Sequence, residues 1–105
     1  MLPRPATRRE PDPYLDRITE ILRRALHDKA CAVYLFGSRA DGTNTAVSDY
    51  DIAVLGDNLS RELSLARELL EESTIPFKVD VVDLNVTSAE FRRNVERDGV
   101  LLWRN

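Results

Sequence analysis

The sequence contains very few cysteine and histidine residues, the side chains that form disulfides, bind zinc and often act as nucleophiles or bases. Its 105 residues include one cysteine and one histidine, which excludes an intrachain disulfide and a cysteine-cluster zinc site. Cys31 opens an apolar run, so we expect a small buried hydrophobic side chain there rather than a nucleophile. His27 falls near the end of an expected helix, away from any Gly-Ser turn in sequence, which argues against a Ser-His-Asp hydrolase.

Long apolar runs and an excess of positive charge are also missing. No segment approaches the roughly 20 apolar residues of a membrane span, and the N-terminal MLPRPATRREPDP lacks the apolar stretch of a signal peptide. We therefore expect no membrane partner and a cytoplasmic location. The formal net charge of −3 gives no overall attraction to nucleic acid. A ligand that carries phosphate must then be bound by local features.

The chain length suits one small domain with a single core. Residues 1–12 are rich in Pro and Arg and lack apolar periodicity, which predicts a flexible tail before a domain spanning 13–105. Helical spacing of apolar residues predicts three helices, with a further short turn after Ser38, and short apolar runs predict four strands. The helices are expected at about 13–27, 61–73 and 88–98, and the strands at 31–36, 49–56, 77–84 and 100–103.

This alternation of strands and helices predicts the α/β (α+β) class, with a small mixed sheet of about four strands flanked by three or four helices. Capping residues support the expected helix ends. Asp12 and Ser60 suit the N-caps of the first two helices, and Thr87 with Glu90 has capping-box spacing. Gly99 suits a left-handed cap at the end of the last helix.

Three aspartates stand where apolar residues would be expected. Asp49 and Asp51 flank one residue at the start of a strand, and Asp80 interrupts the next one. Side chains alternate between the two faces of a strand, so Asp49 and Asp51 share a face, and pairing of the two strands would bring Asp80 beside them. Such acids repel one another unless one is protonated or a cation binds between them. A hard divalent ion such as Mg²⁺ suits these oxygen ligands. Structural capping at the strand end is the competing interpretation.

Several other motifs fail on inspection. Gly37 and Gly42 have the spacing of a P-loop, but Thr43 and Asn44 follow where Lys and Ser or Thr are required. An EF-hand loop would need an acid or amide where Ala53 stands. A phosphatase-type Asp-x-Asp ends its strand, whereas here the apolar run follows the acids.

The combination of Gly37-Ser38, then Ser48-Asp49-Tyr50-Asp51, then Asp80 resembles the polymerase-β-type nucleotidyltransferase superfamily. Within it, the small minimal nucleotidyltransferase (MNT) domains, with loops like GSRARG…SDxDLxV, are most similar. Asp41 departs from this pattern because many such domains carry a second Arg there.

The resemblance implies a metal site of Asp49, Asp51 and Asp80 for two Mg²⁺ ions, the same three aspartates acting as catalytic residues. It also implies ATP as substrate, with Gly37, Ser38, Arg39 and Ser48 as nucleotide-binding residues. A surface salt bridge is an alternative role for Arg39.

Minimal domains of this kind pair with a separate HEPN toxin, as the antitoxin of a toxin–antitoxin system. The resemblance therefore implies transfer of AMP to a hydroxyl of that partner, expected to be a tyrosine. Two alternatives stay open: a binding module that neutralises its partner by contact, and an antibiotic-modifying nucleotidyltransferase. The sequence also leaves open whether the protein forms homo-oligomers or hetero-oligomers.

Overall fold

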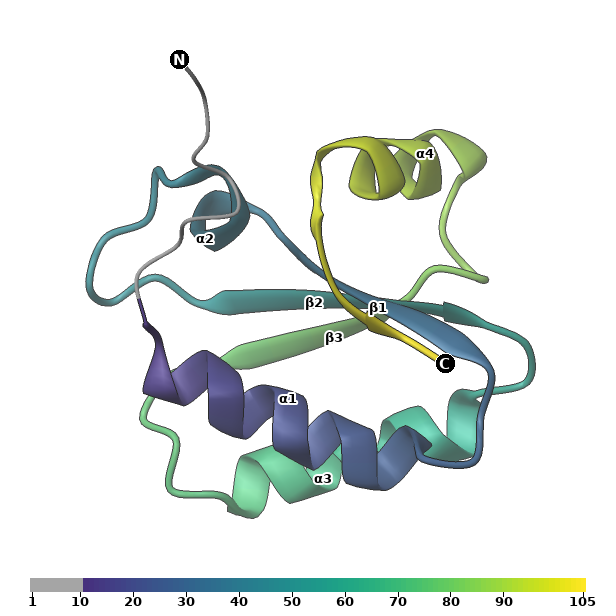
Figure 1. Cartoon of the computed structure of the whole chain (residues 1–105), viewed down its shortest axis with the longest axis horizontal. Coiled ribbons are helices and arrows are strands. Elements are labelled where there is room, and N and C mark those ends of the chain that lie inside the picture. The colour runs from purple at the N-terminus through teal and green to yellow at the C-terminus, as the bar shows by residue number, and fades with distance from the viewer. Residues whose placement is uncertain (1–10) are drawn as a thin grey trace.

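Four strands form one mixed sheet in the computed structural model, which describes residues 11–105 (Figure 1). The strand order is β3-β2-β1-β4, and β1 runs antiparallel to β2 and β4, whereas β2 and β3 are parallel. The strands are β1 (Cys31–Phe36), β2 (Tyr50–Gly56), β3 (Val79–Asp83) and β4 (Val100–Arg104). This confirms the predicted class and the four-stranded mixed sheet. The predicted tail, residues 1–12, lies outside the described residues except for its last two positions.

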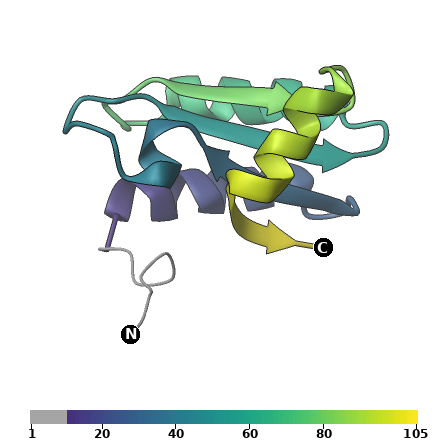
Figure 2. The same ribbon diagram turned by 90° about the horizontal axis from the view of Figure 1, so that it is seen from above.

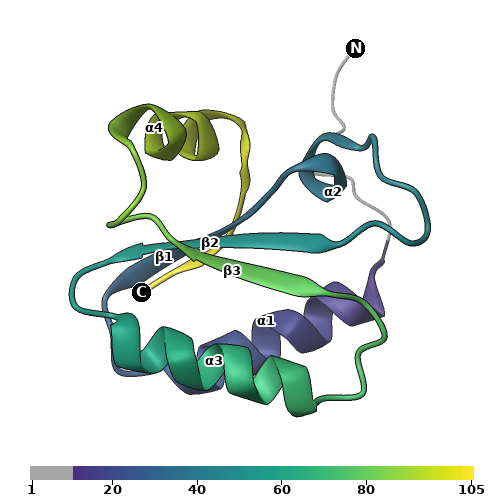
Figure 3. The same cartoon turned by 180° about the vertical axis from the view of Figure 1, so that it is seen from behind.

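The helices divide between the two sides of the sheet. The longer pair, α1 (Pro13–Leu26) and α3 (Ser60–Glu72), packs side by side under one face, as the views from the front and from behind agree (Figures 1 and 3). The short α2 (Ser38–Asp41) and α4 (Ala89–Asp98) lie toward the other side (Figure 2). Because parallel strands need a long crossover, α3 is what allows β3 to pair with β2.

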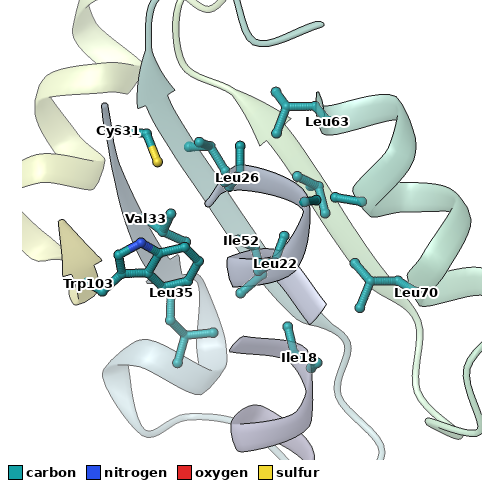
Figure 4. Packing of buried hydrophobic residues seen from close by; sticks show 14 of the residues in the cluster. Ile18, Leu22, Leu26, Cys31, Val33, Leu35, Ile52, Leu63, Leu70 and Trp103 are labelled. Carbon is teal, nitrogen blue, oxygen red and sulfur yellow. The ribbon is translucent and has the colours of Figure 1, made fainter. Parts of the chain in front are cut away.

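Most of the core lies between the sheet and the α1/α3 pair (Figure 4). Alternate strand residues point into it, among them Val33, Leu35 and Ile52, and they meet Leu22 of α1 and Leu63 of α3. All five are at most 1% exposed. Burying a side chain of this size stabilises the fold by about 1.5–3 kcal/mol, so this layer fixes the register of every strand.

A smaller apolar cluster covers only part of the opposite face. It joins Tyr34 and Ala53 of the sheet to Val95 of α4, and Phe36 packs edge-on against Phe91 at a centroid distance of 5.5 Å. Because α4 covers this face only in part, polar side chains on the same face can reach solvent. The partial cover leaves room for a site on this side of the sheet.

Three details of the predicted helix ends are wrong. Leu59, not Ser60, occupies the N-cap of α3, and Ser60 is its first helical residue. Ser88 caps α4 by accepting from the Phe91 N–H, in place of the expected Thr87/Glu90 capping box. Gly99 is extended (φ −76°) rather than left-handed, because β4 begins at the next residue and continues in an extended direction.

Candidate active site

Two of the three aspartates lie next to each other on the sheet. In the parallel pairing of β2 with β3, Asp51 is in register with Asp80, and residues in register on neighbouring strands point to the same face. That face is opposite the α1/α3 layer, because the flanking Tyr50 and Ile52 point into that layer. Asp49 is exposed and directly precedes β2. Strand pairing therefore brings Asp51 and Asp80 together on one face, with Asp49 at the entry of the same strand.

The pKa of Asp51 shows that this arrangement destabilises its ionised carboxylate. Burial raises the pKa of the Asp51 carboxyl, the charges of Asp80 and Asp49 raise it further, and Lys78 lowers it. Lys78 Nζ lies 3.7 Å from Asp80 Oδ1; the Lys78 side chain is largely exposed and that of Asp80 about half exposed. This one exposed cation offsets only part of the repulsion, so the cluster favours an added positive charge.

The backbone turn at Gly37 approaches Asp51 closely. Gly37 has φ +78°, a conformation that favours glycine. A Cβ atom placed there would lie 2.4 Å from Asp51 Oδ2. The residue after it, Ser38, is half-buried and begins α2. The sequence therefore uses glycine here to bring a turn of backbone against the carboxylate.

Arg39 holds the loop that leads to the aspartates. Its Nε donates to the carbonyl of Ser48 at 3.0 Å and its Nη2 to the carbonyl of Ala46 at 3.4 Å. The guanidinium also stacks on Tyr50, 4.0 Å from the ring centroid. These contacts bind backbone carbonyls and an aromatic face, a positioning role that the sequence did not predict for Arg39. Arg39 fixes the entry of β2.

Ser48 and Asp41 also shape this loop. The Ser48 hydroxyl accepts from the Thr45 N–H at 2.9 Å. Asp41 accepts from both the N–H and the hydroxyl of Thr43, and these hydrogen bonds lower the pKa of its carboxyl. Asp41 thus stabilises the turn that follows α2.

A further contact ties the site to the first helix. Asp12 accepts hydrogen bonds from the N–H groups of Tyr14 and Leu15, as the predicted N-cap of α1. It also accepts from the Tyr50 hydroxyl, at 2.9 Å to Oδ2. Burial and this hydrogen bond raise the pKa of Tyr50 to about 12. The residue between the two aspartates is thereby anchored in the core.

The three carboxylates have the chemistry of a Mg²⁺ or Mn²⁺ site, because hard divalent cations prefer oxygen ligands. Among residues 11–105, no group of three or more His, Cys, Asp or Glu side chains already has the spacing of a metal site. The shared face, the raised pKa of Asp51 and the close Gly37 turn fit a cation. Lys78 was not predicted from the sequence, although it stands two residues before Asp80, a spacing that puts both side chains on one face.

Asp51→Asn is expected to stabilise the protein at neutral pH without divalent ions. The raised pKa means that ionised Asp51 destabilises the folded state at pH values above that pKa. The destabilisation disappears as the pH falls through the raised pKa of Asp51, because the carboxyl then becomes neutral. The difference in free energy of unfolding between Asp51→Asn and wild type should therefore be largest near pH 7.5 and vanish near pH 3.5. Urea unfolding with EDTA at several pH values measures the difference.

The matched control is Asp57→Asn, an exposed aspartate just beyond the other end of β2, which should show no such gain. Loss of stability in Asp51→Asn at pH 7.5 would instead identify Asp51 as a structural cap.

Comparisons with known proteins place this arrangement in a family. A family model described as polymerase beta, nucleotidyltransferase matches residues 16–105. Protein adenylyltransferase MntA of Shewanella oneidensis is 38% identical over 92 residues, which are 84% of this chain and 63% of that protein. A probable protein adenylyltransferase MntA of Haemophilus influenzae is 34% identical over 74 residues, 67% of this chain and 63% of that protein. The chain thus spans less than two thirds of the length of these curated relatives.

Several solved structures that align with this chain are toxin–antitoxin complexes. One, described as a toxin–antitoxin with AMP-PNP, aligns with a TM-score of 0.66 and 36% identity over 86% of this chain and 73% of the matched chain. Another holds a tri-AMPylated HEPN toxin of Shewanella oneidensis with its MNT antitoxin, with a TM-score of 0.59 and 32% identity over 88% and 71%. With the family model matching nearly the whole described chain, the protein belongs to the polymerase beta nucleotidyltransferase family.

Proposed function

We propose that this protein transfers AMP from ATP to a hydroxyl, expected to be a tyrosine, of a partner HEPN toxin, and that this modification makes it an antitoxin. The observation that carries the proposal is the in-register pair Asp51 and Asp80 beside the Gly37 turn. Relatives named as protein adenylyltransferases, and a solved complex that holds an AMPylated HEPN toxin, support it. ATP is a cytoplasmic metabolite, so the proposal places the reaction in the cytoplasm.

The three aspartates have two roles in this proposal. Asp49 and Asp51 would hold two Mg²⁺ ions, and Asp80 would complete the site on the side of the attacking hydroxyl. When bound, the ions supply positive charge that makes the hydroxyl more acidic and neutralises the leaving pyrophosphate. Asp80, with its side chain 46% exposed, lies where an acceptor can approach from solvent.

The bond changes follow from this placement. The acceptor oxygen attacks the α-phosphorus of ATP, an O–P bond forms, and the bond from the α-phosphorus to the bridging oxygen of the β-phosphate breaks. Pyrophosphate leaves, and the Asp80 carboxylate takes the hydroxyl proton. The protein takes little part in the covalent chemistry, so it accelerates the reaction mainly by positioning the reactants and by electrostatic stabilisation of the transition state.

The nucleotide is assigned to the turn at Gly37 and Ser38. The missing side chain of Gly37 allows a phosphate to approach backbone N–H groups, and Ser38 adds a hydroxyl donor. Arg39 and Ser48, expected as nucleotide contacts, form hydrogen bonds that hold the loop before Asp49. Their contribution is to keep Asp49 and Asp51 in place beside the triphosphate.

One observation favours the second candidate, a protein that neutralises its partner by contact alone. The Lys78–Asp80 ion pair balances part of the acidic charge without any metal. A binding module would use at least one copy per target and leave no covalent mark. It would also tolerate loss of the aspartates, because binding energy usually resides in a few buried anchors.

Asp49→Asn should reduce AMP transfer by at least 100-fold, because one ionic metal ligand is lost. Mass spectrometry of a purified HEPN toxin, after incubation with ATP, Mg²⁺ and a substoichiometric amount of this protein, measures the added AMP. Asp57→Asn is the control and should act like wild type. A partner that stays unmodified yet is neutralised by both wild type and Asp49→Asn would show the contact mechanism instead.

Gly37→Ala should abolish binding of Mg²⁺·AMP-PNP, because the new Cβ displaces the Asp51 carboxylate. Gly42→Ala is a close control: Gly42 has φ +84°, but a Cβ added there would meet no atom within 4 Å. Gly42→Ala should lose about 1–2 kcal/mol of stability through left-handed strain, and Gly37→Ala should lose more, because φ +78° with ψ −158° is a backbone region that essentially only glycine adopts. Isothermal titration calorimetry and urea unfolding separate the effects, and equal nucleotide affinity in both variants would contradict this role of Gly37.

A further inference from the structure

The outer edge of β3 presents backbone groups to its surroundings. Within residues 11–105, β3 pairs with β2 on one side only. The carbonyl of Lys78 accepts from β2 at 3.0 Å, and the N–H of Leu84 donates to β2 at 2.9 Å. Hydrogen-bonding direction alternates along a strand, so the N–H and C=O groups of Val79 and Val81 point away from β2, toward the outer edge.

One of these outward groups already has a partner, which confirms the direction. Arg67 of α3 donates to the carbonyl of Val81, at 2.8 Å from Nη2 and 3.3 Å from Nε. The peptide groups of Val79, one residue before Asp80, point the same way. The edge is therefore open for pairing at the position where β3 carries its aspartate.

A groove follows this edge and is continuous with the candidate active site. Its lining includes Asp51 and Asp80 from the sheet, Ser64 and Leu65 from α3, and Phe77 from the segment before β3. Figure 3 shows the β3 edge with α3 beneath it. The groove is thus a hollow that leads from an unpaired backbone edge to the proposed acceptor side of the site.

The charges of the groove argue for a polypeptide as occupant. Four acids and three bases line it: Asp51, Asp80, Glu68, Glu71, Arg61, Arg67 and Lys78. A nucleic acid strand needs a continuous positive track along its phosphates, and this mixed lining does not provide one. An extended peptide uses backbone hydrogen bonds for affinity and pockets for alternate side chains, which matches an open edge bordered by apolar Leu65 and Phe77.

Building on the function proposed above, we propose that an extended segment of the acceptor protein adds to the edge of β3 as a fifth strand. Side chains of an added strand alternate between the two faces of the sheet. One set lies on the Asp80 face, and the other set lies toward α3. A tyrosine in the first set is carried next to the Asp80 carboxylate, which selects acceptors whose hydroxyl lies in an extended segment.

Two variants test this pairing in different ways. Val79→Pro removes the outward N–H while the bonds to β2 stay, because proline is tolerated on an edge strand. Ser64→Trp fills the groove from an exposed position on α3 and leaves β3 unchanged. Ala89→Trp adds the same bulk at an exposed position on α4 and is the control. Circular dichroism establishes that each variant is folded.

Steady-state AMP transfer to a purified HEPN toxin is then measured against toxin concentration, together with the Kd of Mg²⁺·AMP-PNP. Both groove variants should raise the KM for the acceptor protein at least tenfold, with the nucleotide Kd within twofold of wild type. Ala89→Trp should match wild type. Wild-type KM in folded Ser64→Trp would overturn the inference while leaving the proposed function intact.

Hydrogen exchange tests the pairing at the β3 edge even if no AMP transfer is observed. In the complex of Asp49→Asn with the HEPN toxin, hydrogen exchange at the amides of Val79 and Val81 should slow at least tenfold. Absence of protection in a formed complex would overturn the edge pairing. Protection that grows with protein concentration in the absence of partner would assign the edge to a second copy of this chain, which also overturns it.

Discussion

The repulsion between Asp51 and Asp80 is the constraint on which the rest of the structure depends. Burial and the charges of Asp80 and Asp49 raise the pKa of the Asp51 carboxyl, so holding this carboxylate ionised in the fold costs free energy. The packed layer of α1 and α3 against the sheet offsets this cost, because it fixes the register that puts both residues on one face. The fold holds charges together that would otherwise separate.

The same constraint explains how the surrounding contacts are arranged. Gly37 lets the chain approach Asp51, Arg39 holds the loop before it, and Tyr50 is fixed by Asp12 at the start of α1. These contacts come from separate segments of the chain. Each limits the movement of the strand that carries the aspartates, as a site that works by positioning requires.

Periodicity was enough to predict the sheet, the long helices and the face shared by Asp51 and Asp80, because these follow from local patterns and strand alternation. Sequence patterns could not predict the loop contacts, because Arg39 contacts Ser48 and Tyr50 only through the path that the chain takes at α2. Gly99 was misassigned because its backbone is set by the start of β4 at the next residue rather than by its own preference. The placement of Lys78 follows from alternation, but its pairing with Asp80 depends on side-chain direction.

Diffraction from crystals grown with Mn²⁺ and AMP-PNP tests the central claim most directly, because manganese scatters anomalously and has the same ligand preference as magnesium. The account predicts anomalous peaks at coordination distance, about 2.0–2.2 Å, from the Asp49 and Asp51 carboxylates, with the triphosphate on the Gly37 turn. Asp80 should leave Lys78 and complete one site. Manganese bound only elsewhere, with the Lys78–Asp80 pair intact and nucleotide present, would contradict it.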